Sequence, residues 1–247
     1  MAQDGEDDVP GGMLNSERQL HALFAVPFVT ATLAGAGTLN PVLRELFLRR
    51  EGEGAHWRNP QPSMNIVPGL FESRWDLFAW PEPCVQQLQD FCLGTLLRVV
   101  AELNQYSLDD MRRLELQNHC WFHVTRRGAC FNAHNHAMAS WSGVYCVDPG
   151  RHDADQPLSG ALHFQNPHQH ANMFQDPGND RLPADYAFTG RNMLLSGGQL
   201  VLFPSWLFHE VRAFHGEGER ITVAFNCWFR PRSAVHTQAP YQPLPPG

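Results

Sequence analysis

The stretch that decides the fold is residues 119–148, which read HCWFHVTRRGACFNAHNHAMASWSGVYCVD. β-Branched and aromatic residues are dense here, and Arg126, Arg127 and Gly128 interrupt them in the way that a turn interrupts two strands. Four further strand regions, separated by glycine- and proline-rich turns, are expected at residues 159–166, 191–206, 209–215 and 220–229. Many short strands of this kind are typical of an antiparallel sandwich or jelly roll.

The chain before this stretch favours helices. A strand-like run begins at Leu20, and residues 39–52 and 83–104 then carry apolar side chains at helical spacing, with Asn40 predicted as an N-cap. Helices followed by many strands predict an α+β domain whose N-terminal helices pack on the β part. We expect one domain at residues 17–230.

The two ends of the chain differ in composition from the predicted domain. Residues 1–16 are polar and acidic, which is typical of a disordered segment. Residues 231–247 are proline-rich and predict an extended tail. The first residues also lack the cationic start and apolar stretch of a secretion signal, so a cytoplasmic location is expected.

Charge excludes several classes of chemistry and partner. The chain has 247 residues, 25 acidic side chains and 18 basic ones, and every basic residue is an arginine. Without lysine there is no primary amine for a Schiff base, a pyridoxal-phosphate anchor or a phosphate-loop contact. The net charge of −7 and scattered arginines argue against nucleic acid or an anionic membrane as partner. The six cysteines form no CxxC pair and are expected to be reduced thiols.

Three histidines stand out among the thirteen. His134 and His136 are two residues apart, so on a strand both imidazoles point to one face, as two ligands of one metal ion require. A pair at this spacing also occurs by chance in a histidine-rich chain, as surface or core histidines. His209 follows the predicted strand that ends in Phe203 and Pro204, and it is a candidate third ligand.

Arg220 and Thr222 open the last predicted strand on one face, eleven and thirteen residues beyond His209. Asn226 shares that face if no bulge intervenes. Asn132 has the same parity as His134 and is a candidate for the pocket lining or for support of the metal ligands. His163 is a further candidate for a pocket wall. The tryptophans near the motifs, Trp121, Trp141, Trp206 and Trp228, are expected mainly to pack the sandwich, with a substrate platform such as Trp141 as the second interpretation.

Together these motifs resemble the 2-oxoglutarate/Fe(II)-dependent oxygenase family of mostly uncharacterised bacterial and phage proteins. The resemblance rests on His134-Asn-His136, on Ser142-Gly-Val-Tyr145, on Phe203 to His209, and on Arg220 to Asn226. It implies a double-stranded β-helix, a cupin-like jelly roll, that uses Fe(II), 2-oxoglutarate and O2. It also implies a dioxygenase that hydroxylates an unactivated C–H bond of a small molecule or peptide and releases succinate and CO2.

The resemblance also implies roles for single residues. His134 and His209 match the two metal-binding histidines of the family, and His136 stands where most members of the wider superfamily have Asp or Glu. Arg220 and Thr222 would bind the distal carboxylate of 2-oxoglutarate. Ser142, Tyr145 and Asn132 are weaker candidates for contact with the co-substrate, and His163, Asn226 and Trp141 are candidates for the substrate pocket.

Several alternatives stay open at this level. Water or Asp148 could complete the metal site in place of His136, and a three-histidine site could prefer another metal. One rival function is a cupin-like three-histidine dioxygenase that needs no 2-oxoglutarate. Another is a non-catalytic jelly roll that binds metal. Neither the substrate nor the oligomeric state, with a homodimer as one option, follows from the residues.

Overall fold

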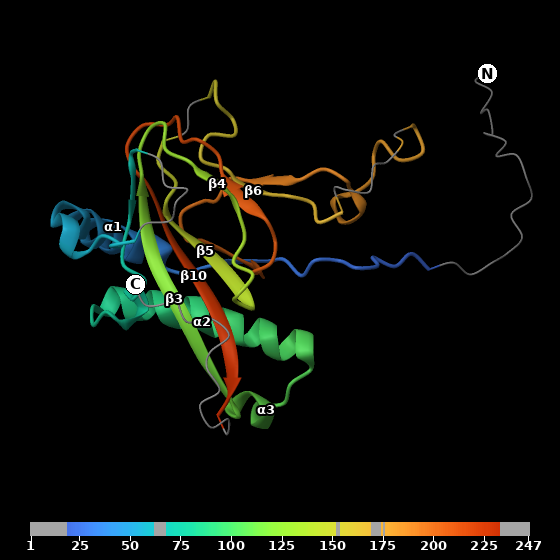
Figure 1. The fold of residues 1–247 in the computed structure, drawn as a ribbon, viewed down its shortest axis with the longest axis horizontal. Helices are drawn as coiled ribbons and strands as arrows, with labels where there is room; N and C mark the ends of the chain where they lie inside the picture. The colour runs from blue at the N-terminus through green and yellow to red at the C-terminus, as the bar shows by residue number, and fades with distance from the viewer. Residues whose placement is uncertain (1–18, 62–67, 152–153, 169–173, 175, 233–247) are drawn as a thin grey trace, which may run out of the picture.

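A computed structural model describes residues 19–61, 68–151, 154–168, 174 and 176–232 (Figure 1). Its helices and strands, in chain order, are β1 (Val29–Thr32), α1 (Ala36–Gly52), η1 (Gly54–His56), β2 (Leu70–Glu72), η2 (Leu77–Ala79), α2 (Pro83–Asn104), α3 (Leu108–Arg112), β3 (Leu114–Thr125), β4 (Phe131–His134), β5 (Trp141–Asp148), β6 (Leu162–Phe164), η3 (Ala184–Tyr186), β7 (Arg191–Met193), β8 (Gln199–Pro204), β9 (His209–Val211) and β10 (Arg220–Pro231).

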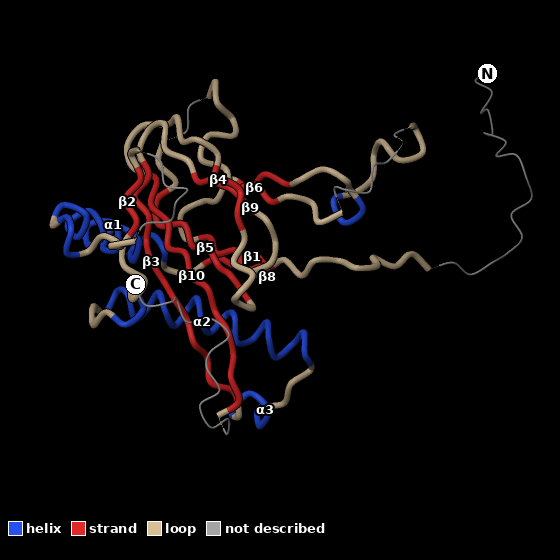
Figure 2. The backbone as a smooth tube through the Cα atoms, in the orientation of Figure 1, coloured by secondary structure: helices blue, strands red, loops and turns tan. Residues whose placement is uncertain are grey.

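The strands form two antiparallel sheets. The larger has the order β1-β8-β5-β10-β3-β2, and the smaller has the order β4-β9-β6-β7 (Figure 2). Every strand pair is antiparallel, and chain neighbours are rarely sheet neighbours, as the crossovers of a jelly roll require. The predicted double-stranded β-helix with N-terminal helices is confirmed.

Helices α1 and α2 cover one face of the larger sheet. In β10, one of the two central strands, the side chains of Ile221, Val223, Phe225 and Cys227 point to the helices and join the main apolar core. The residues between them point to the smaller sheet, because side chains alternate along a strand. The helices therefore close one face of the sheet and leave the other face for a site.

The start of α1 differs from the prediction. The helix begins at Ala36, after Gly35 in the left-handed region at φ 83°, so Asn40 lies inside the helix and caps nothing. Its buried amide instead donates to the Val147 carbonyl oxygen at 2.8 Å and accepts from the Tyr145 hydroxyl at 2.7 Å. Asn40 thus anchors the helix to β5.

One cross-strand contact in the larger sheet depends on glycine. Gly143 in β5 lies opposite Phe225 in β10, and a Cβ at position 143 would stand 2.2 Å from Phe225 Cζ. The ring therefore lies across the bare backbone, and no other residue type leaves that room.

Other predictions concern the ends and surface of the chain. The predicted disordered segment lies outside the described residues, as does the predicted tail apart from Pro231 and Arg232. All six cysteines are free thiols. Within the described residues, no helix combines the length and apolar character needed to cross a bilayer.

Candidate active site

A small cavity of about 50 Å³ lies between the two sheets. The larger sheet contributes the inward face of β10, with Arg220, Thr222, Ala224 and Asn226, and the smaller sheet contributes the histidines at the ends of β4 and β9. The alternation of β10 thus brings the two distant motifs of the sequence to one place.

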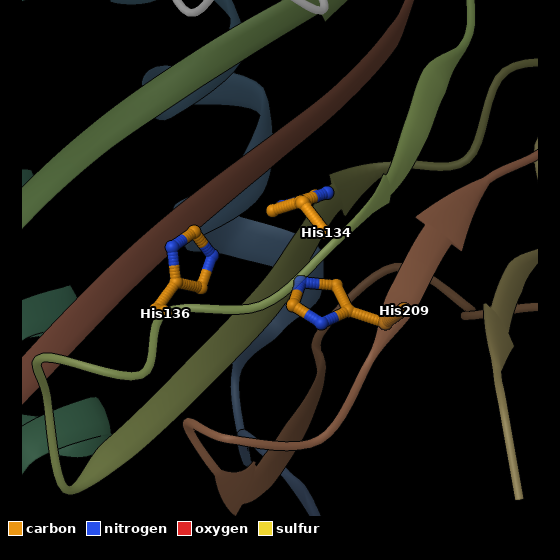
Figure 3. A group of neighbouring side chains, drawn as sticks. All are labelled: His134, His136 and His209. Atoms are coloured by element: carbon orange, nitrogen blue, oxygen red, sulfur yellow. The ribbon is translucent and has the colours of Figure 1, made fainter.

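His134 and His209 are partners on adjacent strands of the smaller sheet. His134 ends β4, His209 begins β9, and the two are paired in register. His136 lies in the loop that follows β4, where its backbone N–H donates to the Ser205 carbonyl oxygen at 2.8 Å. The three rings turn toward a common space (Figure 3), and their ligand nitrogens all lie within 4.8 Å of one another. The structure therefore brings the three predicted imidazoles together.

Backbone carbonyls orient two of these rings. His134 Nδ1 lies 2.7 Å from the Asn132 carbonyl oxygen, and His209 Nδ1 lies 2.9 Å from the Leu207 carbonyl oxygen. Because a carbonyl oxygen only accepts, each Nδ1 carries the proton and each Nε2 keeps a free lone pair. This is the tautomer that a metal ligand needs.

Burial keeps the three imidazoles neutral. Removal from water, and then the neighbouring imidazoles, lower the pKa of His136 to about 3. The same effects lower the pKa of His209 to about 3. Burial also lowers the pKa of His134. At neutral pH the cluster offers lone pairs instead of charge, as metal binding requires.

Arg220 is a buried cation without an ionic partner in the described part of the chain. Arg220 is 5% exposed and forms no salt bridge with any described residue. Burial lowers the pKa of its guanidinium, but an arginine side chain stays charged in proteins. Gly160 makes room for it, since a Cβ there would stand 2.9 Å from Arg220 Cδ. A buried cation of this kind favours an anionic ligand.

Polar groups link β5 to the inner face of β10. Ser142 Oγ donates to Asn226 Oδ1 at 2.7 Å and lies 2.8 Å from Ser205 Oγ. Ser142, Asn226 and the buried Thr222 all line the cavity. These three candidates from the sequence are therefore placed at the site with Arg220.

The structure places two candidates on the wrong side of the larger sheet. Tyr145 is fully buried beneath α1 and α2, where its hydroxyl donates to Asn40, and Trp141 packs against the same core. Both have the opposite parity to Ser142 on β5, so neither lines the cavity. The predicted co-substrate contact of Tyr145 and the pocket role of Trp141 are corrected accordingly.

Three further candidates lie away from the cavity for local reasons. A register irregularity between Phe131 and His134 breaks the alternation of β4, so Asn132 is exposed and contributes only its carbonyl oxygen. His163 points to the outer side of the small sheet, where Nδ1 lies 2.8 Å from Asn192 Oδ1. Asp148 accepts from Arg44 Nε at 2.9 Å and is not part of the histidine cluster.

A second pocket, of about 470 Å³, adjoins the cavity and shares His134, His136 and Asn226 with it. The strand residues His119, Trp121 and Trp228 line it, together with Trp75. The sequence did not predict this outer pocket, because Trp121 and Trp228 were expected mainly to pack the sandwich and a substrate platform was only the second interpretation. A signal was present for Trp228, which has the parity of Arg220 and Asn226 on the last strand.

A buried polar pair borders the outer pocket. His123 Nε2 lies 3.1 Å from both Glu72 Oε2 and Trp121 Nε1, and Asn59 Nδ2 donates to Glu72 Oε1 at 2.6 Å. Burial raises the pKa of Glu72, but the hydrogen bond and the charge of His123, together with the hydrogen bond from Asn59, outweigh burial and the net pKa is lowered. Glu72 is therefore a carboxylate at neutral pH.

Fold and site define the class: a double-stranded β-helix with a three-imidazole cluster and a buried arginine inside it. Residues 119–226 match the model of the family described as "Putative 2OG-Fe(II) oxygenase". That range contains every residue of the cluster and Arg220, so the resemblance predicted from the motifs is confirmed. Among curated proteins, none matches the chain significantly.

Solved structures show the same fold at low identity. A prolyl-4-hydroxylase of Pseudomonas putida is 17% identical with a TM-score of 0.52, over 84% of this chain and 94% of that one. HygX of Streptomyces hygroscopicus, solved with nickel, 2-oxoglutarate and hygromycin B bound, is 15% identical with a TM-score of 0.54, over 83% of each chain. A prolyl hydroxylase of Trichoplax adhaerens in complex with a hypoxia inducible factor peptide is 13% identical with a TM-score of 0.50, over 81% of this chain and 83% of that one.

Proposed function

We propose that this protein is an Fe(II)- and 2-oxoglutarate-dependent dioxygenase that hydroxylates an unactivated C–H bond of a small molecule or peptide. The observation that carries the proposal is the convergence of His134, His136, His209 and Arg220 on one cavity between the sheets. The family match over residues 119–226 supports the same conclusion.

The donor set fits a divalent transition metal. Three neutral imidazoles within 4.8 Å of one another suit iron, and a set of three protein ligands leaves positions for a chelating co-substrate and O2. His134, His136 and His209 would hold the ion. Fe(II), when bound with 2-oxoglutarate, supplies the activation of O2 that this chemistry needs.

Arg220 and Thr222 fit the far end of the co-substrate. The guanidinium offers a bidentate pair of N–H donors to a carboxylate, and the Thr222 hydroxyl adds a donor from the same face of β10. Both residues are buried, at 5% and 2% exposure, so little water competes for the carboxylate. The chain thus binds and orients the 2-oxo acid from the end away from the histidines.

The outer pocket is the proposed substrate site. It adjoins His134 and His136 directly, and Asn226 borders both spaces. HygX was solved with a small molecule bound and the Trichoplax enzyme with a peptide, and a pocket of about 470 Å³ suits a small molecule or one side chain of a peptide.

Arg220→Gln tests the proposal. We expect 2-oxoglutarate to bind at least about 100-fold more weakly because a charge-assisted pair is lost in a dry site, while Fe(II) affinity stays within about twofold. The measurement is anaerobic titration of the iron-loaded protein with 2-oxoglutarate, followed by visible absorbance. Arg212→Gln is the matched control, because Arg212 pairs with Asn192 on the outer side of the small sheet.

The anaerobic titration and a separate aerobic assay for succinate distinguish the rival functions. A three-histidine dioxygenase without 2-oxoglutarate would bind iron but show no absorbance change with the 2-oxo acid, in wild type or variant. A non-catalytic metal-binding jelly roll would form no succinate from 2-oxoglutarate and O2. Either result overturns the proposal.

A further inference from the structure

The outer pocket has one wall built of adjoining aromatic rings. Ring centroids lie 5.9 Å apart between Trp75 and Trp121, 5.4 Å between Trp75 and His119, and 5.0 Å between His119 and Trp228. Trp121 also lies 6.1 Å from the His136 ring, so the row leads away from the histidine cluster. Three indoles offer several π-faces within reach of one ligand.

The permanent charges among the described residues that line this pocket are negative only. Among the described residues that line it, Glu72 is the only carboxylate and there is no arginine. Glu72 is 3% exposed and is paired with Asn59, which is neutral, and with His123, which is a cation only when it is protonated. Residues 135–139, which also line the pocket, add only neutral side chains, since the imidazole of His136 is neutral at neutral pH. Anions therefore find no permanent cation in the described walls.

We propose that the outer pocket binds the cationic group of an organic substrate, an alkylated ammonium or a comparable soft cation, between the tryptophan faces and the Glu72 carboxylate. A cation over an indole face is attracted by the ring quadrupole, most strongly where water is excluded, and a nearby carboxylate adds to that attraction. The cation would lie beside Trp75 and Glu72, whose side chains are neighbours, which leaves a neighbouring C–H group toward His134 and His136.

This inference rests on the proposed function, because the bound cation is a substrate only if the protein is the proposed oxygenase. Its binding step needs neither metal nor 2-oxoglutarate. Cation binding can therefore be measured on the metal-free protein, and succinate formation from 2-oxoglutarate without substrate can be measured separately.

The test compares choline with 3,3-dimethyl-1-butanol, which has nearly the same shape and no charge. Tryptophan fluorescence of the full chain is followed during titration with each probe. We expect saturable quenching by choline below about 50 mM and at least about tenfold weaker binding of the neutral alcohol. Equal binding of the two probes, or no saturable binding of choline, overturns the inference.

Variants locate the bound cation. Trp75→Leu removes one face of the row, and Glu72→Gln removes the charge while keeping the shape. We expect each to weaken choline binding by at least about threefold and Glu72→Gln to reduce the preference over the alcohol. Trp206→Leu is the control, because Trp206 is 48% exposed and does not line the pocket.

Folding of the variants is checked independently. Glu72 is buried, so its variant is compared with wild type by thermal unfolding, and Trp75, which is only partly buried, provides the second route. If Trp75→Leu and Trp206→Leu both bind choline as wild type does, the cation site is not here. Succinate formation together with that result would leave the proposed function intact and the substrate class wrong.

Discussion

His136 is the residue on which the chemistry of the cluster depends most. It lies in a loop beyond β4, yet hydrogen bonds of its backbone N–H to Ser205 and of its carbonyl oxygen with Ala139, each 2.8 Å, hold its position. These bonds fix the backbone from which the His136 ring reaches the cluster. A third neutral ligand leaves the bound metal one unit more positive than a carboxylate would.

Substitutions at position 136 test whether this ring is a ligand. His136→Ala is expected to lower Fe(II) affinity by at least about tenfold, whereas His136→Asp keeps a ligand atom and retains tight binding. Anaerobic competition with a metal-binding dye measures both. His163→Ala serves as control on the outer side of the small sheet. Wild-type affinity in both His136 variants would show that the ring is not a ligand.

The same histidines predict a pH dependence of the metal-free protein. The pKa of His136 and His209 is about 3 in the folded state, against an ordinary value of 6.5. Between these values the unfolded chain binds more protons, so the free energy of unfolding falls as the pH drops below 6.5. The contribution of these two neutral imidazoles to the free energy of unfolding is fully present above pH 6.5.

Urea unfolding of chelator-treated protein at several pH values from about 8 to about 5 checks this dependence. Carboxylates also titrate in acid, so the comparison is with His136→Asn, whose stability should decline less steeply with falling pH. Parallel curves for the two proteins would contradict the assignment of the effect to the buried imidazole.

At the scale of elements, β10 organises the molecule. Its odd residues from Ile221 to Cys227 fill the core under the helices, and its even residues from Arg220 to Asn226 line the cavity. It pairs with β3 on one side and β5 on the other. A shift of one residue in its register would exchange core and site.

Close packing of β10 on β5 predicts a steric effect. Gly143→Ala would place a methyl group 2.2 Å from Phe225 Cζ, and the ring cannot move without disturbing the core. We expect a loss of about 1–3 kcal/mol in the free energy of unfolding. Gly94→Ala in α2 is the control: nothing lies within 4 Å, so it should stabilise by about 0.5–1 kcal/mol. Urea unfolding measures both, and an unaffected Gly143 variant would contradict the packing.

Periodicity and the family resemblance together explain why part of the site could be predicted from the sequence. Strand alternation placed Arg220 and Thr222 on one face, and the resemblance joined His134, His209 and Arg220 into one site. Asn132 was misplaced because an irregularity in β4 breaks that alternation. Alternation alone does not say which face of β5 meets the helices, so Tyr145 was assigned to the site when it belongs to the core.

At the scale of the whole molecule, the helix layer is attached to the sheet by few polar contacts. Asn40 in α1 binds β5 through Val147 and Tyr145, both from buried groups. Arg44 of the same helix pairs with Asp148 and Glu219, at the ends of β5 and just before β10. These ion pairs are partly exposed, so they contribute little energy beside the core.

Tyr145→Phe separates a structural role from a role in the site. Loss of the 2.7 Å hydrogen bond to Asn40 should lower the free energy of unfolding by about 1 kcal/mol and leave 2-oxoglutarate affinity unchanged. Urea unfolding and anaerobic titration provide the two measurements. Weaker co-substrate binding with unchanged stability would restore the role first expected from the sequence.

The outer pocket shows what the sequence could not reveal at this scale. Its walls come from β2, β3 and β10, which the strand order β10-β3-β2 of the larger sheet brings together, and from Trp75 and the loop after β4. Strands that are neighbours in the sheet but distant in the chain leave no local sequence pattern, because the residue spacing within one strand does not indicate which strand it pairs with.

The burial of Arg220 links folding to metabolism. Enclosing a charge that lacks an ionic partner among the described residues opposes folding, and an anion bound to it would offset that opposition. If that anion is 2-oxoglutarate, every increase in its concentration favours the native state by mass action. The amount of this enzyme that survives proteolysis in a cell would then follow the supply of its own co-substrate.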